Sequence, residues 1–236
     1  MCGIVGYVGT PGQSKPALGV VIDALRRMEY RGYDSAGIAL LDGSGGMAVE
    51  KKAGKLDNLV ATVESAGLEN YPATTGIGHT RWATHGRPTD INAHPHVDQL
   101  GKIAVVHNGI IENFAPLRAE LEAQGVEFTS ETDTETVTHL LHAEYYGEGP
   151  NAGNFTASVM AVINRLEGAF TLVIAHADHP DMLMACRRST PLVIGVGEHQ
   201  MFLGSDVAAF IEHTREAVEL GQDNVVTITA DGYTIT

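Results

Sequence analysis

The chain has 236 residues, of which 44% are hydrophobic and 19% charged, a composition typical of a folded protein with a substantial core. Its formal net charge is −14, and only 15 lysines and arginines are available to build a basic face, which argues against nucleic acid as a partner. The opening MCGIVGYVG has no secretion-signal pattern, and no apolar stretch approaches the roughly 20 residues of a membrane span. We therefore expect one domain over residues 1–236, cytoplasmic, without a membrane partner and with a small-molecule substrate.

Short apolar, β-rich runs predict strands along the whole chain. They lie at 3–8, 37–41, 47–51, 75–79, 103–107, 170–175, 183–187, 192–196, 201–203 and 225–229. The glycine-rich segment 42–46 separates two of these runs and predicts a hairpin, so part of the sheet should be antiparallel.

Apolar residues at three- and four-residue spacing predict helices between the strands. These helices lie at 16–30, 56–66, 113–124, 133–146 and 154–166. The segment 147–153 could link two domains, but the strands after it are too few for a second domain, and we interpret it as a loop. Strands grouped together, with helices between the groups, predict an α+β sandwich in which helices pack outside stacked sheets.

Cys2 directly follows the initiator methionine, and a small residue there normally permits removal of Met1. The thiol and a free α-amine would then belong to one residue; they titrate near about 8.5 and about 8, so the amine can accept the thiol proton at neutral pH. By position alone, Cys2 could equally be a small apolar residue that begins a strand. Gly3 and Gly6 are interpreted as leaving the backbone beside it open to a substrate carbonyl. Cys186 is interpreted as a reduced, buried strand residue without a chemical role.

Six stretches of the chain, taken in order, closely resemble one known family. They are MCGIVGYVG (1–9), RGYDSAGIA (31–39), GHTRWATHGRP (78–88), NAHPH (92–96), HNGIIEN (107–113) and SETDTE (130–135). Together they resemble the N-terminal glutaminase domain of the glutamine-fructose-6-phosphate aminotransferases, the glucosamine-6-phosphate synthase family. Other class II glutamine amidotransferases, which donate ammonia to phosphoribosyl pyrophosphate or aspartate, are similar in the opening cysteine but depart at the later motifs.

The resemblance implies a fold and an activity. The fold would be the N-terminal nucleophile hydrolase type, a four-layer α/β/β/α sandwich. The activity would be hydrolysis of L-glutamine to glutamate and ammonia through a Cys2 thioester, without a cofactor or metal. In the full-length enzyme the ammonia would convert fructose 6-phosphate to glucosamine 6-phosphate for amino-sugar synthesis. The sugar-phosphate isomerase half is expected outside this chain, and a homodimer of the full-length enzyme is left open.

Asn108 and Gly109 follow an apolar run and offer a side-chain amide and an unhindered backbone N–H. Two such donors are what an oxyanion hole needs, although an Asn-Gly pair is otherwise an ordinary turn. The resemblance assigns Asn108 and Gly109 to the oxyanion hole.

Charged residues in the same motifs suggest a clamp for the amino-acid end of glutamine. Arg81 matches an α-carboxylate bidentately, and Asp133 could hold the α-ammonium. Asp133 also stands where a helix N-cap is expected, and one oxygen could serve each role. The resemblance further implies that Thr84 and His85 line the pocket, that Trp82 is its gate, and that Arg31 lies near Cys2 and favours the thiolate.

Three alternatives stay open at the level of sequence. Several histidines close in sequence could form a metal-binding module, although their spacing is poor for metal ligands: His79, His85, His94, His96 and His107. A second alternative is a non-catalytic domain that senses glutamine. A third keeps the glutaminase chemistry and supplies ammonia to another acceptor.

Overall fold

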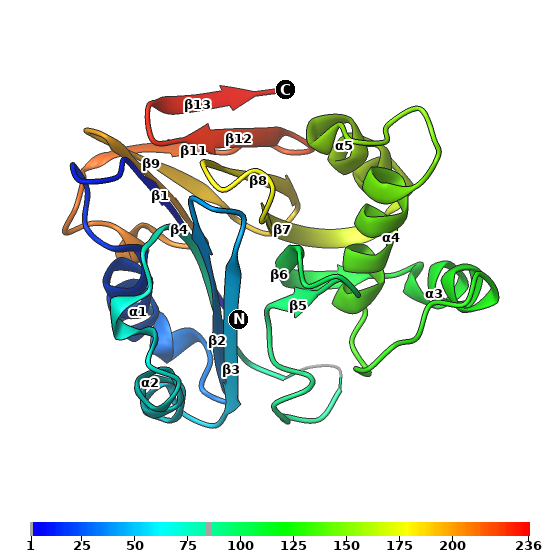
Figure 1. The fold of residues 1–236 in the computed structure, drawn as a ribbon, viewed down its shortest axis with the longest axis horizontal. Coiled ribbons are helices and arrows are strands. Elements are labelled where there is room, and N and C mark those ends of the chain that lie inside the picture. The colour runs from blue at the N-terminus through cyan, green and yellow to red at the C-terminus, as the bar shows by residue number, and fades with distance from the viewer. Residues whose placement is uncertain (1, 84–85) are drawn as a thin grey trace.

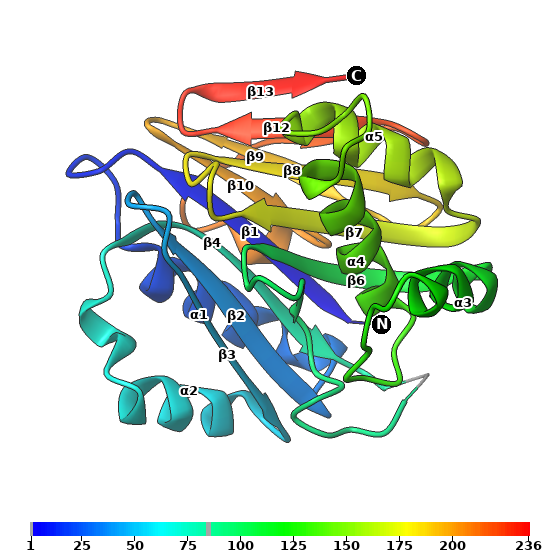
Figure 2. The same cartoon turned by 45° about the vertical axis from the view of Figure 1, so that its right-hand side comes forward.

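The computed structural model describes residues 2–83 and 86–236. Within them the strands form two stacked sheets, and helices cover the outer face of each sheet (Figures 1 and 2). This arrangement confirms the predicted α+β sandwich with its α/β/β/α layers. Every strand pairing found in the described part of the chain is antiparallel.

The seven-stranded sheet of the described residues has the order β11-β9-β10-β1-β4-β2-β3. Its strands are β1 (Gly3–Gly9), β2 (Ser35–Asp42), β3 (Met47–Ala53), β4 (Ala73–Arg81), β9 (Val193–Gly197), β10 (Gln200–Gly204) and β11 (Glu216–Glu219). Helices α1 (Ala17–Met28) and α2 (Leu56–Ser65) pack on its outer face.

The six-stranded sheet, again of the described residues, has the order β13-β12-β8-β7-β6-β5. Its strands are β5 (His96–Val97), β6 (Ile103–Ile111), β7 (Gly168–His176), β8 (Met182–Arg188), β12 (Val225–Thr229) and β13 (Gly232–Ile235). Helices α3 (Phe114–Ala123), α4 (Thr134–Tyr146) and α5 (Phe155–Arg165) contribute to the apolar cluster on its outer face.

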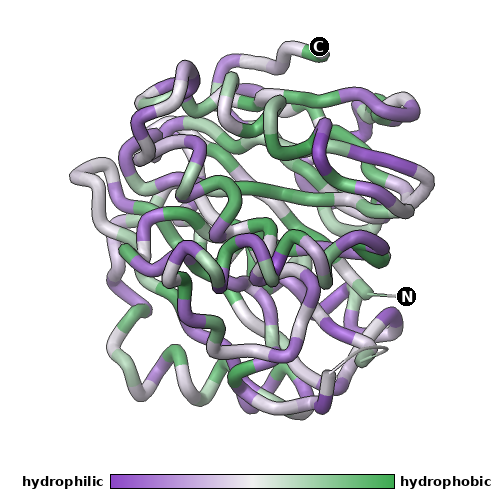
Figure 3. The backbone as a smooth tube through the Cα atoms, turned by 90° about the vertical axis from the view of Figure 1, so that its right-hand side faces the viewer, coloured by the Kyte–Doolittle hydropathy of each residue, from purple (hydrophilic) through white to green (hydrophobic). Residues whose placement is uncertain are grey.

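Strand β7 illustrates how the sequence fills the layers on both sides of a sheet. Phe170, Leu172 and Ile174 belong to the cluster shared with the helices, whereas Val173 and Ala175 belong to the cluster between the two sheets. Because both faces are buried, such strands read as continuous apolar runs. Figure 3 shows long hydrophobic stretches along strands that cross the middle of the molecule. Cys186 is 2% exposed in the helix-side cluster, which confirms its interpretation as a buried strand residue.

The predicted strands and helices are all present, with bounds that differ by a few residues, and three short strands were missed. Strands β11 and β13 are the terminal strands of their sheets and carry mostly exposed side chains, so they lack an apolar pattern. Strand β5 is only two residues long. Among the described residues, we find no helix with the length and apolar character needed to span a bilayer.

The predicted hairpin at 42–46 joins β2 to β3. The Asp42 carboxylate accepts hydrogen bonds from the backbone N–H groups of Ser44 and Gly46, which closes the turn. The loop 147–153 connects α4 to α5, and both helices contribute to one apolar cluster.

Candidate active site

A cavity of about 460 Å³ lies where the start of β1 meets the ends of β4 and β6. Seven residues predicted from the sequence line it: Cys2, Arg31, Arg81, Trp82, Asn108, Gly109 and Asp133. The other two predicted pocket residues, Thr84 and His85, lie outside the described residues. The fold therefore gathers into one site motifs that are up to 131 residues apart in sequence, from position 2 to position 133.

Cys2 is placed by the pairing of β1 with β4, in which Gly3 stands opposite Thr80. The backbone N–H of Trp82 donates a hydrogen bond to the Cys2 sulfur over 3.2 Å. Burial raises the pKa of the Cys2 thiol, and the Trp82 N–H acts in the opposite direction. A thiol in this setting needs a nearby base before it becomes a strong nucleophile at neutral pH.

The glycines after Cys2 do not have the role expected from the sequence. A Cβ at Gly3 would stand 2.7 Å from the Thr80 hydroxyl and 3.0 Å from Met28, and one at Gly6 would stand 3.1 Å from Leu203. The space beside these glycines is filled by the protein, so they permit close packing in the core and do not open a path for substrate.

Asn108 lies within β6, which extends past the predicted run to Ile111. Its Nδ2 donates to the carbonyl oxygen of Cys2 over 3.0 Å. A primary amide carries two N–H donors, so this bond fixes the group beside Cys2 while a second donor remains for a ligand.

Gly109 follows in the same strand with φ of 116°, a backbone conformation that L side chains rarely adopt. A Cβ at this position would stand 2.0 Å from the carbonyl oxygen of Ala169 on the neighbouring strand β7. Both observations require glycine here, and the pair lies in a strand beside the cavity instead of in an isolated turn.

Arg31 lies beside Cys2, as the resemblance implied. Its Nε donates to the Cys2 carbonyl oxygen over 3.3 Å, and its guanidinium forms an ion pair with Asp206 at 3.2 Å. The positive charge near the thiol is therefore partly balanced by a carboxylate.

Arg81 and Asp133 supply opposite charges to the wall of the cavity. Arg81 is 5% exposed, and its guanidinium donates to the carbonyl oxygens of Gly86 and Arg87 over 3.3 and 3.4 Å. Burial lowers the pKa of Arg81, whereas the negative charge of Asp133 acts to raise it. A cation and an anion in one cavity are complementary to a zwitterionic amino acid.

The prediction that the Asp133 side chain caps helix α4 is wrong. Asp133 precedes the helix but has helical backbone angles, and its side chain makes no capping bond. The Oδ2 atom instead accepts from the backbone N–H of Ile111 over 2.8 Å, which ties the start of α4 to the end of β6. A cap needs extended backbone at this residue, so the local geometry excludes that role.

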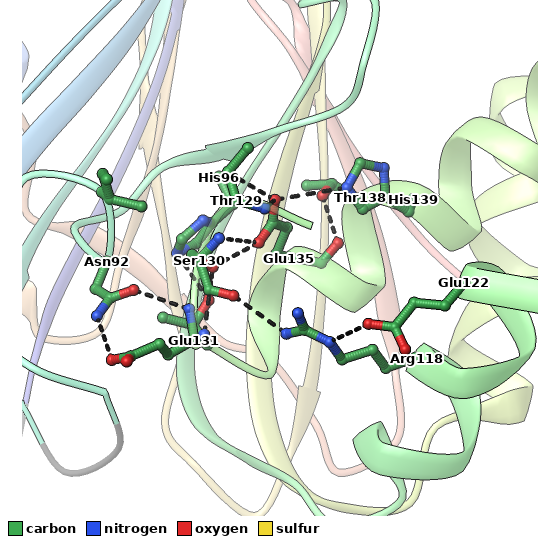
Figure 4. A network of polar contacts seen from close by, with 12 residues as sticks. Asn92, His96, Arg118, Glu122, Thr129, Ser130, Glu131, Glu135, Thr138 and His139 are labelled. Carbon is green, nitrogen blue, oxygen red and sulfur yellow. Dashed lines mark hydrogen bonds and ion pairs between the residues drawn. The ribbon is translucent and has the colours of Figure 1, made fainter. Parts of the chain in front are cut away.

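The loop before α4 is held by a buried carboxylate, Glu135 (Figure 4). Its Oε1 accepts from the N–H and hydroxyl of Thr129, both at 2.8 Å, and its Oε2 accepts from the N–H and hydroxyl of Ser130 at 2.6 and 2.7 Å. Burial acts to raise the pKa of Glu135, but the His139 ring and the hydrogen bonds from Ser130 and Thr129 outweigh it and hold the pKa well below its ordinary value. Four hydrogen bonds thus shape the loop that presents Asp133 to the cavity.

Further bonds connect this loop to the segment around Asn92. The Glu131 N–H donates to Oδ1 of Asn92 over 2.9 Å, and Arg118 donates to the Ser130 carbonyl over 3.1 Å (Figure 4). The Thr132 hydroxyl and His96 Nε2 are 2.9 Å apart.

Four of the five histidines considered as metal ligands, His79, His94, His96 and His107, form a buried group of rings at the wall of the cavity, and His85 lies outside the described residues. His94 stacks on His79 with ring centroids 4.4 Å apart, and its Nδ1 accepts from the backbone N–H of His107 over 3.2 Å. His96 meets His94 edge-on at 4.9 Å. Within residues 2–83 and 86–236, no three His, Cys, Asp or Glu side chains are arranged to hold a metal ion.

Sequence reasoning missed several cavity residues. They are His79, His94, His107, Ile110, Phe114, Thr132, Thr134, Thr190 and Pro191. The histidines stood in the quoted motifs but were weighed only as metal ligands. Thr190 and Pro191 follow β8, far along the chain from the other motifs, and no local pattern marked them.

Comparison with known proteins places the chain in a family. The family model described as a glutamine amidotransferase domain matches residues 79–212. Two curated relatives are glutamine-fructose-6-phosphate aminotransferases (isomerizing), from Mycolicibacterium smegmatis at 67% identity and Streptomyces coelicolor at 59%. Each match covers 100% of this chain and 37% of the relative, so the chain spans little more than a third of the relatives' length.

Two solved structures share the fold. The glutamine phosphoribosylpyrophosphate amidotransferase from B. subtilis, complexed with ADP and GMP, matches with a TM-score of 0.82 at 23% identity, over 100% of this chain and 49% of that one. A glutamine aminotransferase class-II domain protein from Silicibacter pomeroyi matches with a TM-score of 0.62 at 17% identity, over 100% and 98% of the two chains. The family model matches more than half of the chain, the fold and the relatives agree with it, and the chain belongs to the glutamine amidotransferase domain family.

Proposed function

We propose that the chain hydrolyses L-glutamine to glutamate and ammonia, with Cys2 as the nucleophile. The proposal rests on one observation above the others. The Cys2 thiol, the Asn108 carboxamide and the opposite charges of Arg81 and Asp133 line a single cavity of about 460 Å³. A nucleophile, an oxyanion donor and an amino-acid clamp are the groups that amide hydrolysis requires.

The reaction starts once removal of Met1 gives Cys2 a free α-amine. The amine takes the thiol proton, and the sulfur attacks the carboxamide carbon of glutamine. Collapse of the tetrahedral intermediate breaks the C–N bond, and the nitrogen leaves as ammonia with the proton returned by the amine. Water then attacks the γ-glutamyl thioester, the C–S bond breaks, and glutamate and the free thiol are released.

The oxyanion of each tetrahedral intermediate would be bound by Nδ2 of Asn108 and the backbone N–H of Gly109. Donors that are already fixed in place stabilise developing charge without reorganisation, and loss of one costs roughly 100- to 1000-fold in turnover. Arg81 would bind the α-carboxylate of glutamine and Asp133 its α-ammonium. Thr84 and His85 would complete the pocket, Trp82 would cover it, and Arg31 would favour the thiolate.

The acceptor of the ammonia is proposed from the relatives. Their names give glutamine and fructose 6-phosphate as substrates, and the chain matches 37% of their length. We propose that a longer protein containing this domain passes ammonia to a sugar-phosphate isomerase half, giving glucosamine 6-phosphate. A homodimer of that protein, and a cytoplasmic location, belong to the same proposal.

Glutamate release from glutamine tests the proposal, with Cys2→Ala as the matched variant. We expect release by the wild-type chain and none by Cys2→Ala. Hydroxylamine added during turnover should divert the thioester to γ-glutamyl hydroxamate. A wild-type chain without glutaminase activity, although mass spectrometry finds Met1 removed, would refute the proposal.

Two further experiments test the alternatives of a metal-binding module and a glutamine sensor. Hydrolysis that survives a chelator but stops with a thiol-directed glutamine analogue would argue against a metal-dependent module. Glutamine binding that is equal in wild type and Cys2→Ala, without any turnover, would identify a sensor.

A further inference from the structure

One histidine in the cavity wall contacts the proposed oxyanion donor directly. Nε2 of His79 lies 3.0 Å from Oδ1 of Asn108, while Nδ2 of the same carboxamide donates to the Cys2 carbonyl. A carboxamide oxygen can only accept, so the imidazole must donate from Nε2. His79 belongs to β4 and Asn108 to β6, so this bond crosses between the two sheets.

The surroundings of His79 keep the ring neutral and in the required tautomer. The residue is 1% exposed, and burial lowers the pKa of His79 to about 3. Its Nδ1 has no hydrogen-bond partner among the described residues, whereas its Nε2 faces an acceptor, the carboxamide oxygen of Asn108. The single ring proton therefore stays on Nε2, facing Asn108.

The ring is also held in place by its neighbours. His94 stacks on it with an interplanar angle of 18°, and His94 is itself bound by the backbone N–H of His107 in β6. His79 is thus a rigid donor whose position is set by both sheets.

We propose that His79 is a positioning residue for the oxyanion hole, holding the Asn108 carboxamide so that its N–H donors face Cys2 and the bound amide. Without this bond the Asn108 carboxamide can rotate by half a turn, so that its oxygen takes the place of its N–H donors. The carboxamide oxygen would then repel the negative charge that develops on the substrate. The inference rests on the proposed glutamine hydrolysis and assigns a new role within that site.

Two substitutions at the same position separate the hydrogen bond from the packing. His79→Gln places an amide N–H near the original Nε2 but loses the stacked ring, whereas His79→Phe keeps a ring and loses the donor. We expect His79→Phe to lower kcat by roughly 10- to 100-fold, because small displacements of catalytic groups have effects of this size. KM for glutamine should stay within about 2-fold, since the clamp is untouched. His79→Gln should retain most of the wild-type kcat.

A double-mutant cycle tests whether the effect passes through Asn108. In an Asn108→Ala background, His79→Phe should lower kcat by less than about 2-fold further, because the group that it positions is gone. Additive effects of the two substitutions would overturn the proposal. His176→Phe is the control: His176 is also fully buried, at the opposite end of β7 from the cavity, and its loss should leave kcat unchanged.

A crystal structure of His79→Phe gives a readout that needs no activity. We expect the Asn108 carboxamide to be rotated or in two conformers, and an unmoved amide still bound to the Cys2 carbonyl would overturn the proposal. If the phenylalanine variant does not fold, His79→Asn replaces it, because its shorter amide cannot reach Asn108. A wild-type chain without glutaminase activity would refute the proposed function, while the orientation of Asn108 would still decide the role of His79.

Discussion

The backbone N–H of Trp82 points at the sulfur of Cys2 over 3.2 Å, although 80 residues separate the two in sequence. Trp82 directly follows Arg81, so the segment that carries the proposed carboxylate clamp also contacts the proposed nucleophile. The indole of Trp82 is 46% exposed and packs edge-on against Tyr33 with ring centroids 5.5 Å apart. The proposed substrate contact at Arg81 and the environment of the thiol are therefore connected through neighbouring backbone.

The first prediction concerns the thiol in a chain that retains Met1. Because burial raises the pKa of Cys2, its alkylation by iodoacetamide should still be accelerating above about pH 9. Cys186 is the internal control, since burial raises the pKa of its thiol to about 12 and it should not react in the folded chain. A Cys2 rate that is already constant below about pH 8 would contradict this prediction.

The second prediction concerns the clamp. Asp133→Asn keeps an oxygen for the Ile111 N–H but removes the charge, and Arg81→Lys removes the planar fork. Hydrogen bonds to charged groups contribute about 1.5–3 kcal/mol, so KM for glutamine should rise roughly 10- to 100-fold in each variant, with a smaller change in kcat. Steady-state glutamate release measures both constants. Arg26→Lys, at an exposed arginine on α1, is the control, and an unchanged KM in both clamp variants would rule out the assignment.

The third prediction concerns the glycine at the proposed oxyanion hole. Gly109→Ala forces a Cβ to 2.0 Å from the Ala169 carbonyl at φ of 116°, so the free energy of unfolding should fall by about 3 kcal/mol or more. Gly101→Ala is the matched control because Gly101 has φ of 65° and no atom within 4 Å of its Cβ position. That change should cost only about 1–2 kcal/mol. Urea denaturation compares the two, and equal losses would show that the contact with Ala169 is unimportant.

The fourth prediction concerns pH and the buried Glu135. Its folded-state pKa is lowered, so its contribution to stability is complete above the unfolded pKa of about 4.3 and is lost as the pH falls toward the folded value. Glu135→Gln should therefore lower the free energy of unfolding by about 2 kcal/mol at neutral pH. The difference from wild type should shrink as the pH falls below about 4.

Glu122→Gln is the control for this pH dependence, because Glu122 is half-exposed and pairs with Arg118 on the surface. It should change stability by less than about 0.5 kcal/mol at any pH. A difference between Glu135→Gln and wild type that does not depend on pH would show that the carboxylate charge is not what holds the loop.

Much of the fold could be predicted because most strands are buried on both faces. The run 172–175 is apolar at four consecutive positions, a pattern that predicts a strand covered on both faces. Strand β11 has the sequence EAVE, pairs on one side only and exposes most of its side chains. Its position depends on its pairing with β9, which the local sequence does not indicate.

The site was predictable in its residues more than in its geometry. The sequence motifs predicted Cys2, Asn108 and Arg81 as site residues, and the fold brings all three to one cavity. The Asp133 carboxylate accepts a hydrogen bond from the backbone N–H of Ile111, which belongs to another element. The sequence before α4 is equally typical of a helix N-cap, so sequence alone did not show which group this carboxylate binds. The bond from His79 to Asn108 joins two sheets, and this contact has no trace in either local sequence.

The requirement for a free Cys2 amine is tested most directly by glutamate release from two preparations of this sequence, one retaining Met1 and one lacking it, each verified by intact mass. General base catalysis contributes roughly 100- to 10,000-fold, so the Met1-free chain should be at least about 100-fold faster. Equal rates from the two preparations would contradict the assignment of the Cys2 amine as the base.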